Sequence, residues 1–190
     1  IDLFGGTGSV SYLFKKMGKT VTYNDYLHFN YLSGVALIEN SQFQLEPEDI
    51  GFILTDIEGV KYPAFVEETF EGFFFTKEEN RWIDRRVKNI KLLRNFYKGK
   101  ELYFKQALAF HALFQSCLVK RPFNLFHRKN LYIRLNNVER SFGNTYAWAK
   151  TFEHYYKKFS AEANSLVFSN GKGNLVTCKD VFNCKSITHL

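Results

Sequence analysis

The sequence predicts an α/β fold in which a parallel sheet carries a mostly helical, basic insert. Three features point this way: a glycine-rich turn between a short apolar run and a helix, a second strand and helix directly after it, and a charge that changes sign along the chain. A strand–helix–strand–helix order favours a parallel sheet with right-handed crossovers. We expect residues 1–60 and 161–190 to form the sheet domain and residues 61–160 the insert.

The first half of the sheet domain follows from local patterns. Residues 1–4 are a short strand that ends in the glycine turn 5–8, and apolar residues at helical spacing over 9–17 predict a helix that stops at Gly18. The β-branched and aromatic residues 20–23 predict a second strand. A second helix is expected from about residue 27 to residue 38.

The insert begins with helical patterns. Thr76 and Glu79 have the spacing of a capping box, and the apolar residues after them predict a basic amphipathic helix. Further helices are expected at 101–119, before Pro122, and at about 146–159. Residues 121–134 are expected to form loop and hairpin, and the other expected strands are 73–75, 165–168 and 174–178.

Composition excludes several classes of protein. No run approaches the roughly 18 uncharged apolar residues of a membrane span, and no secretion signal precedes the glycine turn. The three cysteines form no CxxC pair, which argues against a disulfide framework and against a zinc site. We therefore expect a soluble, cytoplasmic protein. The absence of a start methionine and the short first strand suggest an internal fragment.

The charge distribution suggests a nucleic-acid partner. Residues 1–80 hold 5 basic and 13 acidic side chains, residues 81–159 hold 18 and 4, and residues 160–190 hold 3 and 2. A stretch with a net charge of +14 repels itself unless an anion binds there. A solvated basic helix face is the alternative, but the scarcity of acids in this stretch favours nucleic acid.

The glycine turn and Asp25 together predict a cofactor site. A glycine turn lets the backbone approach a ligand, and the following helix offers free N–H groups at its positive end. Asp25 follows the second strand, where a carboxylate can accept hydrogen bonds from ribose hydroxyls. The alternative is a tight loop and an ordinary helix cap. Ser11 replaces the third glycine of the dinucleotide fingerprint, which disfavours NAD and an oxidoreductase.

Residues 2–9 (DLFGGTGS) resemble the S-adenosylmethionine motif of the Dam-like, class D12 adenine-specific DNA methyltransferases of restriction-modification type. Residues 23–25 resemble the ribose-binding motif of that family, and residues 72–84 and 121–128 resemble later family segments. The resemblance implies a Rossmann-like S-adenosylmethionine-dependent sheet with an inserted target-recognition domain. The cofactor residues that it implies are Asp2, Phe4, Gly5, Gly6, Thr7, Gly8, Ser9, Asn24 and Asp25, with Asp180 and Val181 beside the adenine.

Double-stranded DNA is the expected partner of the basic insert. Phosphate contacts give affinity, whereas Arg and Asn side chains can read base edges. The expected DNA-binding residues are Arg85, Arg86, Lys88, Arg121, Asn124, His127, Arg128, Lys129, Asn130, Arg134, Arg140 and Asn144.

The resemblance implies transfer of a methyl group to the exocyclic amine of adenine, which requires the base to be flipped out. The family performs this step with a D/N-P-P-Y/F motif, yet no two prolines are adjacent here. We expect that motif beyond Leu190 and therefore an inactive fragment of an active enzyme that pairs with a restriction endonuclease. The alternative is a catalytically inactive nucleic-acid-binding module with the same fold. Methylation of a cytosine amine or of RNA also remains open.

Overall fold

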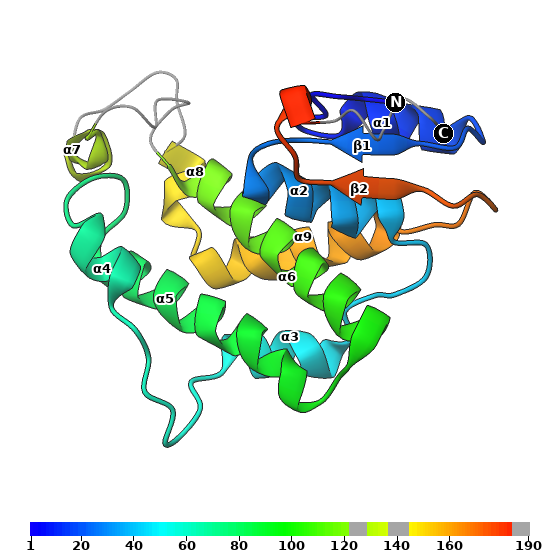
Figure 1. Cartoon of the computed structure of the whole chain (residues 1–190). Helices are drawn as coiled ribbons and strands as arrows, with labels where there is room; N and C mark the ends of the chain where they lie inside the picture. The colour runs from blue at the N-terminus through cyan, green and yellow to red at the C-terminus, as the bar shows by residue number, and fades with distance from the viewer. Residues whose placement is uncertain (122–128, 137–144, 184–190) are drawn as a thin grey trace. The chain divides into compact units, whose positions relative to one another are not determined.

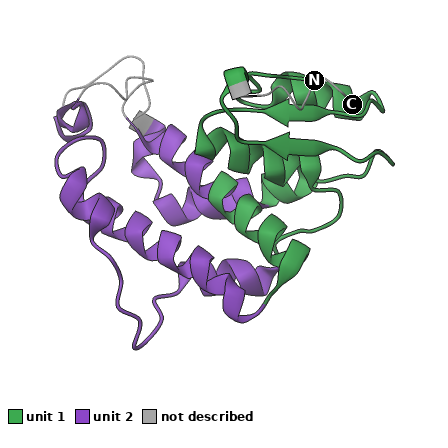
Figure 2. Cartoon of the chain, in the orientation of Figure 1, with its two compact units in different colours: residues 1–45, 97–111, 161–190 green, residues 46–96, 112–160 purple. Residues whose placement is uncertain are grey.

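The computed structural model describes residues 1–121, 129–136 and 145–183. The chain forms two compact units, shown in Figure 2. Unit 1 comprises residues 1–45, 97–111 and 161–190, and unit 2 comprises residues 46–96 and 112–160. The break at 160/161 coincides with an expected domain boundary, whereas the first break falls at 45/46 rather than at 60/61. Residues 97–111, expected in the insert, belong to unit 1.

Unit 1 is built on a small parallel sheet (Figure 1). Strand β1 (Thr22–Asn24) pairs in parallel with β2 (Leu175–Thr177), in a register that places Tyr23 opposite Val176. On the other side of β1, Asp2 forms a parallel bridge with Tyr23. The other elements of unit 1 are α1 (Ser9–Lys16), α2 (His28–Gly34), the π-helix η1 (Val35–Glu39), the 3-10 turn η3 (Val181–Asn183), and parts of α6 and α9.

Helix α1 has the reverse of the burial expected from its apolar spacing. It buries Ser11 and Lys15. The Nζ of Lys15 donates to the carbonyl oxygens of Leu37 and Asn40 at 3.0 and 2.8 Å. Four large apolar side chains on or directly after this helix are instead exposed: Val10, Leu13, Phe14 and Met17.

Among its described residues, unit 2 contains helices, turns and loops but no strand. Its core contains Phe75, Ile83 and Phe152, with Trp82 packed against them. Its elements are α3 (Pro47–Leu54), α4 (Phe65–Thr69), α5 (Lys77–Leu92), the 3-10 turn η2 (Leu93–Asn95), the end of α6 (Gly99–Lys120), α7 (Leu131–Leu135), α8 (Thr145–Ala149) and the start of α9 (Phe152–Leu166).

Several local expectations are confirmed. Helix α5 begins at the expected capping box, in which Thr76 Oγ1 accepts from the N–H of Glu79 at 3.3 Å and Glu79 Oε2 accepts from that of Thr76 at 3.0 Å. The expected helices in 9–17 and 101–119 are present, and β2 lies within the expected strand 174–178.

Other expectations are wrong. Residues 73–75 form turns, because their aromatic rings pack among helices rather than in a sheet. Residues 165 and 166 end α9 instead of starting a strand, and α7 replaces an expected hairpin. The single helix expected over 146–159 is interrupted at residues 150 and 151, where Lys120 Nζ binds the Lys150 carbonyl oxygen at 2.7 Å.

No helix in the described part of the chain is both long enough and apolar enough to cross a membrane.

Candidate functional site

Three parallel segments of unit 1 end at one edge of its sheet. The N–H of Asp2 donates to the Thr22 carbonyl oxygen at 2.8 Å. The N–H of Asn24 donates to the Asp2 carbonyl oxygen, also at 2.8 Å. On the other side of β1, the N–H of Asp25 donates to the Thr177 carbonyl oxygen at 3.2 Å. The carboxyl ends of these segments therefore bring the glycine loop, Asp25 and Asp180 to the same edge, where open α/β sheets bind ligands.

Asn24 joins the three strand ends. Its Nδ2 donates to the carbonyl oxygens of Leu3 and Lys179 at 3.1 and 3.0 Å. Its Oδ1 accepts from Thr177 Oγ1 at 2.7 Å and from the Lys179 N–H at 3.1 Å. These four bonds use the full capacity of a buried amide side chain. Asn24 therefore holds the edge together and has no free polar group for the cofactor, contrary to its expected role.

The glycine loop has the backbone conformation that its sequence demands. Gly6 and Gly8 have φ values of 51° and 77°, in the left-handed region that favours glycine. Gly8 caps the N-terminus of α1, and no side chain caps that helix. The first N–H groups of a helix have no partner within it and lie at its positive end, so this terminus suits an electronegative ligand group.

Asp25 fixes the position of the glycine loop. Its Oδ2 accepts from the N–H of Gly6 and its Oδ1 from the N–H of Leu27, both at 2.8 Å. A carboxylate offers about four acceptor positions, so about two remain for a ligand. Asp25 can thus position the loop and still accept hydrogen bonds from a ribose.

Sequence reasoning placed Tyr23 in the ribose-binding motif but missed its role in supporting the glycine loop. The ring is fully buried, and a Cβ atom on Gly5 would lie only 2.0 Å from its Cε2 atom. On the other edge of the ring, a Cβ atom on Gly34 would lie 2.8 Å from Cε1. The Tyr23 hydroxyl donates to the Gly6 carbonyl oxygen at 2.8 Å. Burial, with Asp25 and Asp2 nearby, raises the pKa of this hydroxyl, so it remains a donor that supports the loop.

The remaining expected cofactor residues differ in accessibility. Asp2 accepts from the buried Ser11 Oγ at 2.7 Å, so the residue that replaces the third glycine ties the first strand end to α1. Asp180 is exposed, and its Oδ1 accepts from the N–H of Phe182 at 3.0 Å. Phe4, Thr7 and Ser9 are exposed, and Val181 is half-buried. The structure brings these residues to the same edge of the sheet without linking all of them to one another.

A cavity of about 150 Å³ lies beside the glycine loop, lined by Gly8, Tyr12, Ser33 and Leu37, among others. Small-molecule sites usually enclose about 300–1,000 Å³. The cavity can therefore hold part of a cofactor, while the remainder would lie along the exposed edge.

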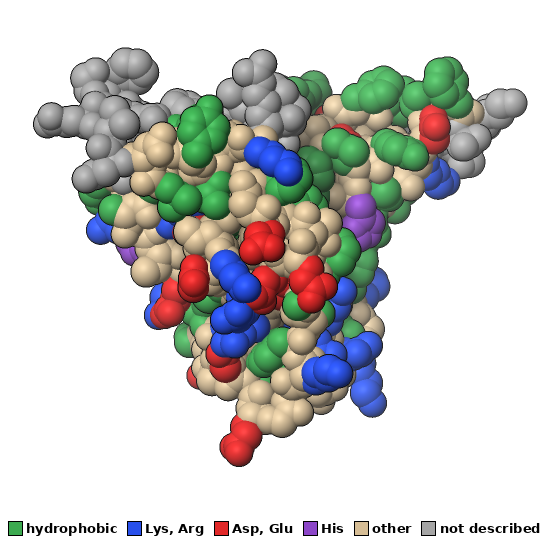
Figure 3. Space-filling model, turned by 90° about the vertical axis from the view of Figure 1, so that its left-hand side faces the viewer, with side chains coloured by type: hydrophobic (Ala, Val, Ile, Leu, Met, Phe, Trp, Pro, Cys, Tyr) green, Lys and Arg blue, Asp and Glu red, His purple; other side chains and the backbone are tan. Residues whose placement is uncertain are grey.

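Two of the basic residues expected to contact DNA lie instead within an ion-pair network of unit 2. Arg86 is 2% exposed; it forms an ion pair with Asp56 and donates to the Ile53 carbonyl oxygen at 2.9 Å. Arg85 also forms an ion pair with Asp56. Basic and acidic side chains lie next to each other on the face shown in Figure 3. Because Arg86 is buried and paired with Asp56, its position does not favour a contact with a DNA phosphate.

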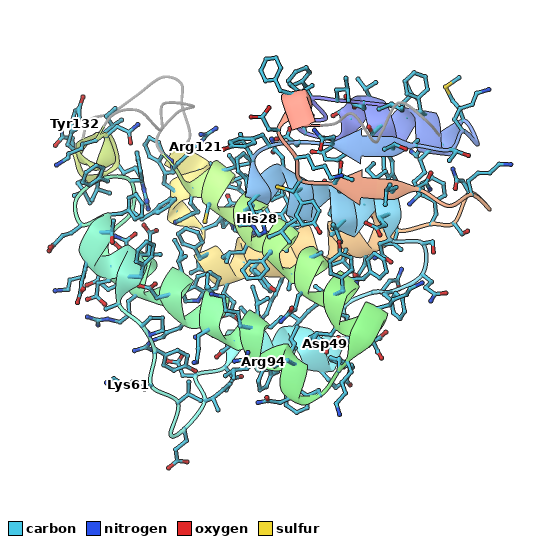
Figure 4. The ribbon with its side chains drawn as sticks, in the orientation of Figure 1. His28, Asp49, Lys61, Arg94, Arg121 and Tyr132 are labelled. Carbon is cyan, nitrogen blue, oxygen red and sulfur yellow. The ribbon has the colours of Figure 1, made fainter. Side chains whose placement is uncertain are left out.

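The other described candidates surround α7 and the end of α6. Lys129 is exposed, with its Nζ 4.1 Å from the centre of the Phe73 ring, whereas Asn130 is buried. Arg121, labelled in Figure 4 at the end of α6, is half-buried, and burial lowers the pKa of its guanidinium. Lys88 is also half-buried. Arg134 forms a bidentate ion pair with Glu79. Asn124, His127, Arg128, Arg140 and Asn144 lie outside the described residues.

Comparison with known proteins agrees with the arrangement of residues described above. The family model described as D12 class N6 adenine-specific DNA methyltransferase matches residues 1–179. The "Type II methyltransferase M2.HphI" of Haemophilus parahaemolyticus is 31% identical over 191 residues, covering 95% of this chain and 52% of the relative. The chain thus spans about half the length of that relative. No solved structure matches.

Proposed function

Because the chain belongs to the D12 class of N6 adenine-specific DNA methyltransferases, we propose that it binds S-adenosylmethionine and double-stranded DNA for the methylation of adenine in a specific sequence. The relative's name describes a Type II methyltransferase, which favours a role beside a cognate restriction endonuclease. In this proposal, unit 1 is part of a Rossmann-like cofactor domain and unit 2 is the target-recognition insert.

The Asp25 carboxylate at the glycine loop carries the cofactor proposal. It holds the Gly6 N–H at 2.8 Å and keeps acceptor capacity for ribose hydroxyls, while the uncapped N-terminus of α1 can receive the electronegative end of the cofactor. Gly6 carries no side chain, and a Cβ added there would meet only the Phe4 carbonyl oxygen, at 3.8 Å, which leaves the backbone open to close approach. These features fit S-adenosylmethionine, whose sulfonium would supply the methyl group.

Asp180 and Val181 are proposed to lie along the adenine of the cofactor. The exposed Asp180 carboxylate can accept from an exocyclic amine, and the Val181 N–H can donate to a ring nitrogen. Asn24 enters the proposal only as the residue that holds Asp180 near Asp25 through its bond to Lys179.

Fewer of the described residues are proposed to contact DNA than the sequence predicts. Among the described residues, Lys129 at the surface and the half-buried Lys88 and Arg121 are proposed phosphate contacts. The ion-paired Arg85, Arg86 and Arg134 are proposed to support the fold instead. Base reading is proposed for Asn124, His127, Arg128, Arg140 and Asn144.

A second function, DNA binding without catalysis, is favoured by one observation. No two prolines are adjacent in the sequence, so these 190 residues do not supply the family's D/N-P-P-Y/F motif for the adenine amine. The residues described here would then bind and orient cofactor and DNA only.

Methyl transfer by the complete gene product separates these functions. The purified protein is incubated with unmethylated duplex DNA and S-adenosylmethionine labelled in its methyl group, and the DNA is digested to nucleosides. We expect label in N6-methyladenine. Label confined to a cytosine product would contradict adenine specificity, and sequence-selective DNA binding without any label would establish the second function.

A further inference from the structure

The carboxylate of Glu79 binds the last turn of helix α7. The Nη1 and Nη2 atoms of Arg134 donate to Oε2 and Oε1 of Glu79, both at 2.7 Å. Beside this pair, the N–H groups of Asn130 and Leu131 donate to the Phe73 carbonyl oxygen, each at 2.9 Å. The start of α7 and its last turn are therefore both fixed to the segment that leads into α5.

The same carboxylate also fixes the end of α6. Lys120 Nζ lies 3.0 Å from Glu79 Oε1 and donates to the carbonyl oxygens of Trp148 and Lys150 at 2.9 and 2.7 Å. A single cluster thus connects the start of α5, the end of α6, α7 and the junction of α8 with α9.

The cluster is largely shielded from water. The side chains of Lys120, Arg134 and Glu79 are 4%, 7% and 17% exposed. Although burial opposes its ionisation, the neighbouring Arg134, Thr76 N–H and Lys120 hold the pKa of Glu79 below its usual range. Glu79 therefore stays charged, and low exposure strengthens its hydrogen bonds to the two cations.

Residues that can meet DNA surround these anchor points. Lys129, Tyr132, Leu135 and Asn136 are exposed on or beside α7; Tyr132 is labelled on that helix in Figure 4. Asn136 is the C-cap of α7, and its exposed amide can pair with a base edge.

We propose that Glu79 is a positioning residue for DNA sequence selectivity: through Arg134 it fixes α7, and with it the exposed Asn136 amide, in the orientation needed to read bases. This inference rests on the proposed DNA-binding function. Glu79 itself need not touch DNA. Because direct readout requires side chains to meet base edges in a fixed geometry, a loosened α7 should lose selectivity while sequence-independent phosphate contacts persist.

Two substitutions separate this role from simple stabilisation. Glu79→Gln keeps the side-chain size and the capping-box acceptor of α5 but removes the charge that binds Arg134 and Lys120. Glu67→Gln is the matched control, because Glu67 also accepts two bonds from an arginine, Arg81, on the surface of the same unit without any bond to α7.

The test is selection of bound duplexes from a random pool, with S-adenosylmethionine present, by the wild-type chain and each variant. We expect the wild type and Glu67→Gln to enrich the same sequence. For Glu79→Gln, discrimination between that sequence and a scrambled duplex should fall at least about tenfold. Affinity for the scrambled duplex and for S-adenosylmethionine should stay within about twofold of the wild type.

Each other result overturns a definite statement. Unchanged discrimination by Glu79→Gln would refute the positioning role, and a parallel loss of affinity for cofactor and both duplexes would show a purely structural role. If Glu79→Gln does not fold, Arg134→Lys decides, since it keeps the charge but not the paired hydrogen bonds; unaltered discrimination by that variant would refute the proposal. Failure of the wild type to enrich any sequence would refute the DNA-binding function itself.

Discussion

Replacing Gly5 with Ala should force the glycine loop and the Tyr23 ring apart. The new Cβ atom would lie 2.0 Å from Cε2 of Tyr23, well inside the 3.4–4 Å of ordinary contact, so the ring or the loop must move by more than 1 Å. The ring cannot simply retreat, because Gly34 flanks its other edge, where an added Cβ would lie only 2.8 Å from Cε1. Either movement also strains the 2.8 Å bond from the Tyr23 hydroxyl to the Gly6 carbonyl oxygen.

Overpacking of this kind costs about 1–3 kcal/mol, and a strained buried hydrogen bond adds about 1 kcal/mol. We therefore expect Gly5→Ala to lower the free energy of unfolding by about 3 kcal/mol, measured by urea denaturation. The control is Gly51→Ala in α3, where an added Cβ meets nothing within 4 Å. That change should stabilise the protein by about 0.5–1 kcal/mol. A Gly5→Ala variant within about 0.5 kcal/mol of the wild type would refute the close packing of Tyr23 against the loop.

Three further predictions concern the site, the core and the network around α5. Asp25→Ala should reduce affinity for S-adenosylmethionine at least tenfold, by calorimetry, because it removes the ribose acceptor and frees the loop; equal affinity would exclude that role. Burial lowers the pKa of His111 from 6.5 to about 4, so its neutral form contributes stability that is present above pH 6.5 and lost as the pH falls toward 4. As the pH falls from 7.5 to 5, the free energy of unfolding of His111→Gln, measured with urea, should therefore rise by up to about 2 kcal/mol relative to that of the wild type. A difference in free energy between the two proteins that does not change with pH would contradict this assignment. Arg86→Met should lower the free energy of unfolding by about 1–3 kcal/mol without weakening binding to random DNA, because it removes a buried hydrogen bond to the Ile53 carbonyl oxygen and the ion pair with Asp56; weaker DNA binding at unchanged stability would restore the phosphate contact expected from the charge pattern.

Local patterns predicted the elements whose cause is itself local. The capping box of Thr76 and Glu79 starts α5, and the glycine turn leads into α1, because both depend on residues a few positions apart. The parallel direction of the sheet followed from the order of strands and helices, whereas the pairing of β1 with β2 was not predicted.

Features that depend on distant partners escaped sequence reasoning. Residues 73–75 have a strand-like composition, yet their surroundings are helical and they form turns. The two-sided confinement of Tyr23 requires Gly5 and Gly34 to lie at opposite edges of its ring, and the spacing of 29 residues between these glycines does not reveal it.

Charge patterning predicted a basic insert but not which cations are accessible. Arg86 and Arg134 look like phosphate contacts in the sequence, and each proves to be paired with a carboxylate inside unit 2. Their partners, Asp56 and Glu79, lie within the acidic first 80 residues. Counting charges separately in residues 1–80 and 81–159 therefore assigns the two members of each ion pair to different segments.

Calorimetric titration of S-adenosylmethionine into the chain, with NAD as the control ligand, tests most directly whether the edge formed by the glycine loop and Asp25 is a methyl-donor site. Saturable binding of S-adenosylmethionine by the wild type, its loss in Asp25→Ala and no heat with NAD are the predicted results. Binding of NAD, or binding of S-adenosylmethionine that Asp25→Ala leaves unchanged, would contradict the proposed site.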